Sequence, residues 1–223
     1  MRRYKVTDIV YGIIFALLFI SIAVVITVNF RPLYYMDIRL LDIEATSGLD
    51  KDTIRANYDA LIDYSSPFFR GELRFPSLEA SESGLQHFAE VKNIFTSFYI
   101  IGAISLVLGI IIIIYKTRNK DYSFMLVSAI TAIALPLLLA VFIAIDFDTA
   151  FVVFHKIFFR NDYWLFDPVT DPVITILPAE FFMHCAIMII LIVIIFSLLF
   201  LWLYSRAKRY KGIKYRKIKG LNL

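Results

Sequence analysis

Four long apolar segments constrain the fold of this 223-residue chain more than any other feature of its sequence. They cover approximately residues 9–30, 93–115, 123–145 and 181–204, and each is long enough to cross the hydrocarbon core of a bilayer as a helix. The mean hydropathy of +0.74 is far above that of a soluble domain. The first segment is too long for a signal-peptide core, so we expect it to remain as an anchor. The sequence therefore predicts an all-α integral membrane protein with four transmembrane helices.

Basic residues gather on one side of the predicted spans. The start of the chain, the connection 116–122 and the tail 205–223 hold 14 of the 23 Lys and Arg residues, but only Asp8 and Asp121 of the 19 acidic residues. By the positive-inside rule, both termini are predicted to be cytoplasmic and both large loops extracellular. The tail directly follows a span, so attraction to anionic lipid heads is a simpler interpretation than nucleic-acid binding.

The first large loop, residues 33–85, is long enough to carry structure of its own, and we interpret it as a small extracellular cap. Residues 36–40 alternate apolar and polar side chains, which is typical of a strand, and residues 71–75 resemble a second short strand. Asp50 is suited to cap an amphipathic helix between them. With no further large loop besides 146–180, the chain 1–223 is expected to form a single membrane domain.

The second large loop, residues 146–180, carries a histidine, a tryptophan and several aspartates between two spans, and we interpret it as an extracellular catalytic loop. A helix from about Thr149 would place phenylalanines on one stripe, with His155 at its edge. His87 falls in the first turn of another helix, which the capping-box pattern Ser83-Gly84-Leu85-Gln86 predicts to continue into the second span. Both histidines are thus expected at the same depth, facing one cleft.

Two histidine side chains are the best candidates for catalytic groups in this sequence. It has no glycine-rich phosphate loop, no HExxH, no cysteine cluster and no GxSxG elbow. His87 and His155 without such a nucleophile indicate general acid–base work on a substrate that brings its own nucleophile. No cofactor is expected, and no metal, because the spacing of His and Asp residues matches no ligand motif. The available orienting carboxylates are Asp148, Asp162, Asp167, Asp171 and Glu90.

Three further residues have more than one interpretation. Arg31 closes the first span, where it is suited either to snorkel to a lipid phosphate or to bind a developing oxyanion. His184 lies inside the last span, where an ionisable group must find a partner. Cys185 beside it cannot form an internal disulfide, because the chain has 1 cysteine. For His184 and Cys185 we prefer a structural role over a catalytic one.

Two segments resemble the lipoprotein intramolecular transacylases (Lit), a family of bacterial four-span membrane proteins. The first segment is His87-Phe88-Ala89-Glu90-Val91-Lys92. The second runs from Phe154-His155-Lys156 through Asn161-Asp162-Tyr163-Trp164 to Asp167-Pro168 and Asp171. Chain length and topology are similar as well, and Glu90 stands where the family pattern has aspartate.

The resemblance implies an acyltransferase in the cell membrane of Gram-positive bacteria, with diacylglyceryl-modified lipoproteins as partners and membrane lipids around it. The enzyme would move the sn-2 acyl chain of the diacylglyceryl group to the α-amine of the N-terminal cysteine, giving a lyso-form lipoprotein. The hypothesis makes His155 and His87 the catalytic pair, with His155 favoured for proton transfer and His87 for assistance, and the order open. Asp148 or Asp162 would set the tautomer of His155, and Trp164 belongs to the supporting residues.

Two other functions stay open on the sequence alone. A non-enzymatic membrane sensor or assembly partner would bind a ligand with its cap and would not need the histidines. A metal-assisted membrane hydrolase would use His and Asp as ligands, and its activity would be lost with a chelator.

Overall fold

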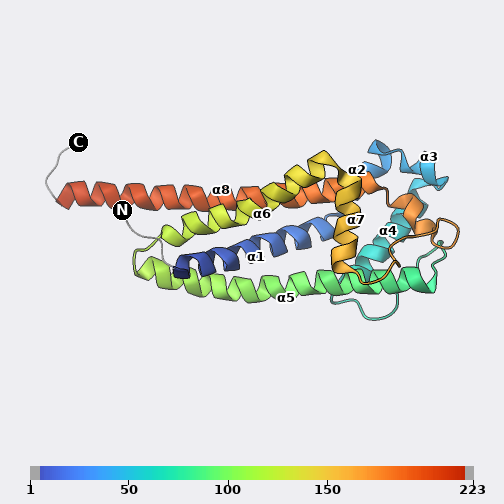
Figure 1. Cartoon of the computed structure of the whole chain (residues 1–223), viewed down its shortest axis with the longest axis horizontal. Helices are drawn as coiled ribbons and strands as arrows, with labels where there is room; N and C mark the ends of the chain where they lie inside the picture. Colours follow the sequence, from blue (N-terminus) through green and yellow to red (C-terminus); the bar gives the residue numbers. More distant parts are fainter. Residues whose placement is uncertain (1–5, 219–223) are drawn as a thin grey trace. The chain divides into compact units, whose positions relative to one another are not determined.

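The computed structural model describes residues 6–218, and within them every regular element is helical (Figure 1). Arg2, Arg3, Lys5 and Lys219, which count toward the predicted cytoplasmic charge, lie outside the described residues. The elements are α1 (Val6–Asn29), α2 (Arg31–Leu40), α3 (Ile43–Ser47), α4 (Lys51–Ser65), α5 (Glu82–Arg118), α6 (Ser123–Ile145), α7 (Phe147–Phe158), the 3₁₀ helix η1 (Pro172–Ile176) and α8 (Ala179–Ile218).

The four predicted spans are confirmed as helices that are long and apolar enough to cross a membrane. They are α1, α5, α6 and the part of α8 from Ala179 to Tyr210. Helix α5 begins well before the predicted span at residue 93, because its polar first turns pack within the loop region through buried residues such as Phe88. Helix α8 continues beyond residue 205 into the basic tail as far as Ile218.

The chain divides by compactness into two units, each assembled from separated pieces of sequence. Unit 1 comprises Met1–Ala23, Ile101–Leu138 and Ile190–Leu223, and so holds parts of the four apolar helices. Unit 2 comprises Val24–Ile100 and Leu139–Ile189, and holds α2, α3, α4, α7 and η1 together with the adjoining parts of the long helices. The single membrane domain stays a prediction.

Aromatic rings fill the interior of unit 1. Phe15 of α1 packs against Phe124 of α6 and Phe200 of α8, with ring centroids 5.7 and 4.9 Å away. A Cβ added at Gly12 would lie 2.8 Å from the hydroxyl oxygen of Thr131. The missing side chain of Gly12 therefore lets α1 and α6 approach closely.

A buried ion group joins α1, α5 and the connection to α6 in unit 1. The Nζ atom of Lys116 lies 2.7 Å from Asp8 Oδ1 and 2.9 Å from Asp121 Oδ2. All three residues are at most 7% exposed. A charge withdrawn from water needs opposite charge beside it, and the ammonium group of Lys116 supplies such charge to both carboxylates.

Unit 2 has a core of its own beneath the cap helices. Tyr34 of α2 stacks on Tyr58 of α4 with ring centroids 3.7 Å apart, and its hydroxyl donates to the carbonyl of Ile176 in η1 at 2.6 Å. The buried core residues are Tyr34, Ile38, Ile43, Ile54, Tyr58, Leu61, Tyr64, Leu73, Phe88, Val173, Ile176, Leu177 and Phe181.

His184 of α8 has a buried partner in unit 2. Its Nδ1 atom lies 2.9 Å from Asp37 Oδ1 of α2, and Asp37 is only 1% exposed. The pair ties α2 to α8 and supplies the contact that an ionisable group in an apolar span requires.

The two predicted short strands are wrong. Residues 36–40 belong to α2, where Pro32 stands at the helix start and the buried residues follow a helical period rather than a period of two. Residues 71–75 lack regular structure, because within the described part of the chain no neighbouring segment pairs with them. The predicted cap at Asp50 is confirmed, since its carboxylate accepts from the backbone N–H of Asp52 and Thr53 at the start of α4.

Replacing Lys116 with methionine should destabilise the protein, because two buried carboxylates lose the ammonium group that contacts both of them. We expect the free energy of unfolding to fall by about 3 kcal/mol or more, measured by denaturant or thermal unfolding in detergent. The control is Arg118→Met at an exposed position near the end of the same helix, which should change it by less than about 0.5 kcal/mol. Equal stability of K116M and the parent would contradict the ion group.

Candidate active site

Unit 2 brings His87 of α5 and His155 of α7 together. Their ring centroids are 5.9 Å apart, with the ring planes inclined by 31°. His87 is 4% exposed and His155 is 8% exposed, so both imidazoles are withdrawn from solvent. The predicted meeting of the two rings is therefore observed, and their catalytic role stays a prediction.

The start of α5, which positions His87, is held by a carboxylate from the second loop. The hydroxyl of Ser81 accepts from the backbone N–H of Gly84 at 3.0 Å and donates to Asp171 Oδ2 at 2.7 Å. Asp171 also accepts the backbone N–H of Ser81 at 2.8 Å. A Cβ on Gly84 would collide with this carboxylate, so only glycine leaves it room. The cap is thus Ser81, two residues before the predicted capping box.

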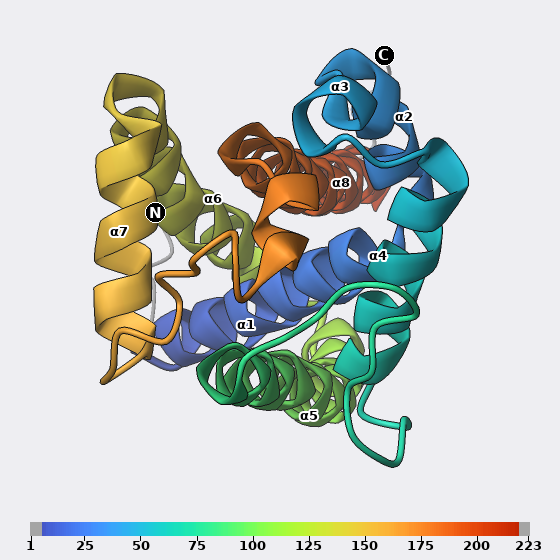
Figure 2. The ribbon, with the colours of Figure 1, turned by 90° about the vertical axis from the view of Figure 1, so that its right-hand side faces the viewer.

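Helix α7, which carries His155, begins at Phe147 rather than at the predicted Thr149. The carboxylate of Asp146 caps it by accepting from the backbone N–H and the hydroxyl of Thr149 at 3.0 and 2.6 Å, and these hydrogen bonds hold the pKa of Asp146 below its usual value. Helix α7 lies crosswise to the first part of α5 in both views (Figures 1 and 2). The crossing sets an imidazole of α7 beside one of α5.

Aromatic rings surround the two imidazoles. His155 stacks on Trp164 with ring centroids 4.7 Å apart and lies 4.1 Å from the ring of Phe151. His87 lies 4.7 Å from the ring of Phe159, which also stacks on His155 at 5.5 Å. In such apolar surroundings the neutral imidazole is favoured, and burial lowers the pKa of His155 from its ordinary 6.5.

The hydrogen bond of His155 fixes which ring nitrogen is basic. Its Nδ1 atom lies 2.8 Å from the backbone carbonyl oxygen of Phe151. Because a carbonyl oxygen can only accept, Nδ1 carries the hydrogen and Nε2 keeps its lone pair. The structure thus gives the orienting role to this carbonyl rather than to Asp148 or Asp162, whose side chains are exposed.

Two polar ring atoms at the site have no hydrogen-bond partner among the described residues. They are Nδ1 of His87 and Nε1 of Trp164, and both are buried. Buried polar atoms are nearly always paired, so these two ring atoms are available to hydrogen-bond a ligand at the site.

Glu90 and Asn161 connect α5 to the segment after α7. The side-chain amide of Asn161 donates to both carboxylate oxygens of Glu90, at 3.0 and 3.2 Å. An open cavity of about 380 Å³ lies at this contact. Its lining residues are Glu90, Asn93, Ile94, Phe158, Phe159, Arg160 and Asn161.

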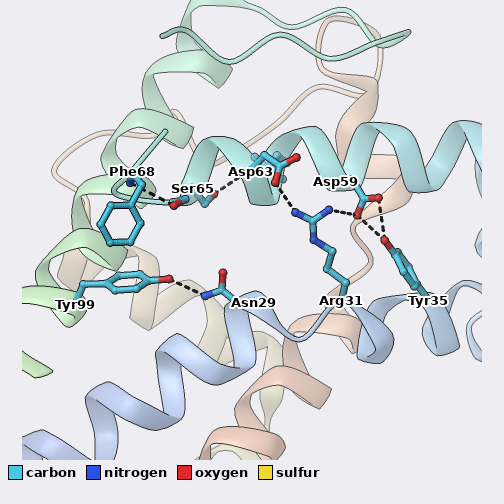
Figure 3. Close-up of polar contacts among 10 residues, drawn as sticks. Asn29, Arg31, Tyr35, Asp59, Asp63, Ser65, Phe68 and Tyr99 are labelled. Carbon is cyan, nitrogen blue, oxygen red and sulfur yellow. Dashed lines mark hydrogen bonds and ion pairs between the residues drawn. The ribbon is translucent and has the colours of Figure 1, made fainter. Parts of the chain in front are cut away.

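Arg31 is engaged by α4 rather than free for a lipid or an oxyanion. Its guanidinium forms ion pairs with Asp59, at 3.0 Å, and with Asp63, and the hydroxyl of Tyr35 donates to the same Asp59 (Figure 3). Arg31 thus holds α2 against α4 in the structure, and its contact with a lipid phosphate or an oxyanion stays a prediction.

The other predicted supporting carboxylates shape the loop instead of contacting an imidazole. Asp167 accepts the backbone N–H of Val169 at 2.9 Å and so forms the turn before η1. Asp171 acts through Ser81 on the start of α5, as described above. Within residues 6–218, no three His, Cys, Asp or Glu side chains form a cluster that could hold a metal ion.

Sequence reasoning missed Ser81, the carbonyl of Phe151 and the amide of Asn161. Ser81 lies three residues before Gly84, and this N-cap spacing was an available signal. A backbone carbonyl leaves no signal in the residue types. Asn161 stood in the segment that carries the family resemblance, but its contact with Glu90 joins positions 71 residues apart.

Four apolar helices and a buried imidazole pair define a membrane-integral helical protein equipped for acid–base chemistry. The family model of the lipoprotein intramolecular transacylase Lit matches residues 9–182. The chain belongs to this family and is an acyltransferase. None of the curated proteins matches the chain.

Solved structures of Lit from Bacillus cereus are similar over nearly the whole chain. An in meso structure has a TM-score of 0.90 and 38% identity, and covers 92% of this chain and 96% of that one. Two variants of the same protein, with a histidine replaced by arginine and by alanine, have TM-scores of 0.83 and 0.85 at 38% identity. They cover 93% and 92% of this chain, and 92% and 94% of their own.

Replacing Gly84 with alanine should loosen the start of α5, because the new Cβ displaces the carboxylate of Asp171 from Ser81. We expect unit 2 to be less stable by about 1–3 kcal/mol, measured as thermal unfolding in detergent. Glu79→Ala, at an exposed position just before the same helix, is the control and should have little effect. A G84A protein as stable as its parent would refute the tight contact.

Proposed function

We propose that the protein transfers the sn-2 acyl chain of a diacylglyceryl-modified lipoprotein to the α-amine of that lipoprotein's N-terminal cysteine. The observation that carries the proposal is the buried pair of imidazoles in a chain of the transacylase family. The product is an N-acyl, S-monoacylglyceryl lipoprotein, the lyso-form.

The reaction needs no nucleophile from the protein. The substrate amine attacks the carbonyl carbon of the sn-2 ester, a C–N bond forms, and the bond between that carbon and the glycerol oxygen breaks. The amine loses one proton and the glycerol oxygen gains one. Holding both arms of one substrate in reacting geometry supplies much of the acceleration, because the reaction is intramolecular.

His155 accepts the amine proton at Nε2, and His87 assists at the carbonyl or the leaving oxygen. The contact of His155 Nδ1 with the carbonyl of Phe151 supports the first role, because it leaves Nε2 basic. The unpartnered ring atoms of His87 and Trp164 support hydrogen bonding to the ester oxygen as negative charge develops there.

The reaction takes place on the extracellular side of the membrane, with both termini in the cytoplasm. The division of charge between the units supports this orientation. Unit 1 holds 14 basic residues and 2 acidic ones, whereas unit 2 holds 9 basic and 17 acidic residues. By the positive-inside rule, the loops that carry the histidines face outward, where mature lipoproteins stand in the lipid leaflet.

Replacing either histidine with glutamine should abolish transfer. The measurement expresses each variant in a host whose lipoproteins carry an intact diacylglyceryl group and a free amine, and then locates the acyl chains on one N-terminal lipopeptide by mass spectrometry. Lys156→Gln, at the exposed position next to His155, should transfer like the parent. Full lyso-form production by both H87Q and H155Q, at normal membrane levels, would rule out the pair.

The pH dependence of kcat/KM should show two breaks. The substrate amine loses its charge at about 7.7–8, and His155 at a lower pH than its ordinary value of 6.5, because burial lowers its pKa. Lowering the pKa keeps the imidazole neutral, and so able to accept a proton, as the pH falls. Trp164→Ala exposes the ring and should move only the lower break upward. A lower break at or above 6.5 in the parent would contradict the role of His155 as a buried base.

A further inference from the structure

The cavity at Glu90 lies directly beside the imidazole pair. Glu90 follows His87 by three residues, which is about one turn of α5 and therefore the same face of the helix. The ring of Phe159 lines the cavity and also contacts both imidazoles, at 4.7 Å from His87 and 5.5 Å from His155. The side chain of Phe159 therefore connects the cavity to the imidazole pair.

The carboxylate of Glu90 is oriented by amides. Asn161 donates to both of its oxygens, and the amide of Gln86 lies 3.4 Å from Oε1. Arg160 lines the same cavity, but among the residues that the structure describes no Lys, Arg or His forms an ion pair with Glu90. A half-buried carboxylate that is oriented by amides and forms no ion pair among the described residues can accept charge-assisted hydrogen bonds from a small cation.

We propose that Glu90, held by Asn161, binds the α-ammonium group of the lipoprotein's N-terminal cysteine at the entrance to the imidazole pair. This inference rests on the proposed function, which gives the substrate a free α-amine. The group is a primary ammonium with three N–H donors, which matches a carboxylate that still has free lone pairs in an open cavity.

The same carboxylate also assists the reaction itself. The bound ammonium first loses one proton to solvent, which leaves a neutral amine beside the carboxylate. When this amine attacks the ester carbon, its nitrogen acquires positive charge as the C–N bond forms. A fixed negative charge near that nitrogen stabilises the developing charge until a histidine removes the proton. Glu90 therefore both selects substrates with a free amine and holds the amine near the two imidazoles.

The test uses two synthetic lipopeptides whose chains are attached to glycerol by ether bonds, so that neither can be transferred. One has a free α-amine and the other is N-acetylated. Binding of each to the purified full-length protein in detergent is measured by thermophoresis at a pH where the amine is charged. The parent should bind the free-amine peptide about tenfold or more tightly than the acetylated one, as one charge-assisted hydrogen-bonding group predicts.

Glu90→Gln should remove this preference and leave the affinity for the acetylated peptide unchanged, because glutamine keeps an oxygen acceptor for Asn161 while losing the charge. Asn161→Leu should reduce the preference by releasing the carboxylate. Glu72→Gln makes the same chemical change at an exposed position outside this cavity and should keep the full preference.

Retention of the preference in E90Q, or its absence in the parent, would overturn the ammonium site. Failure of the proposed function has a different signature, since it would appear as absence of acyl transfer by the parent on ester-linked substrate. The ether-linked peptides cannot react, so their binding reports on Glu90 alone.

Discussion

The hydrocarbon interior of a membrane offers no hydrogen-bond partner to a peptide backbone, and this constraint governs the arrangement of the chain. Long apolar segments in such a medium must be helices, because only then does each span satisfy its own N–H and C=O groups. Polar and ionisable side chains are consequently concentrated in the segments between the spans. The acidic residues of unit 1 are Asp8 and Asp121, and both form ion pairs with Lys116. The residues of the candidate site all belong to unit 2.

The site is built by contacts between segments that are distant in the sequence. Asp171 holds Ser81 and the first turn of α5, which fixes the position of His87. The carbonyl of Phe151 fixes the ring of His155 one turn further along α7. Each of these hydrogen bonds is made by a short side chain or by the backbone. Short side chains lose little conformational entropy when they are ordered, and the hydrogen bonds hold the imidazoles in one geometry. Rigid positioning is what an intramolecular reaction between two arms of one substrate requires.

Much of the fold was predictable from the residues, and the site only in part. Apolar length predicted the four spans, and the pattern after Asp50 predicted α4. The alternation in residues 36–40 is short enough to fit a strand or a helix, and the packing of Tyr34 against Tyr58 decides for a helix. The pairing of His87 with His155 was predicted from their equal depth and the family resemblance. Their surrounding contacts were not.

The sequence by itself determined which segments are long and apolar enough to cross a membrane and which connections gather basic charge, because hydropathy and charge are sums over neighbouring residues. It also indicated His87 and His155 as the candidate catalytic pair. Only the tertiary structure decided that Arg31 serves α4, that Asp148 stays away from His155, and that Asn161 orients Glu90. Hydrogen bonds depend on ångström distances between atoms of remote segments, and the order of residues along a chain does not contain those distances.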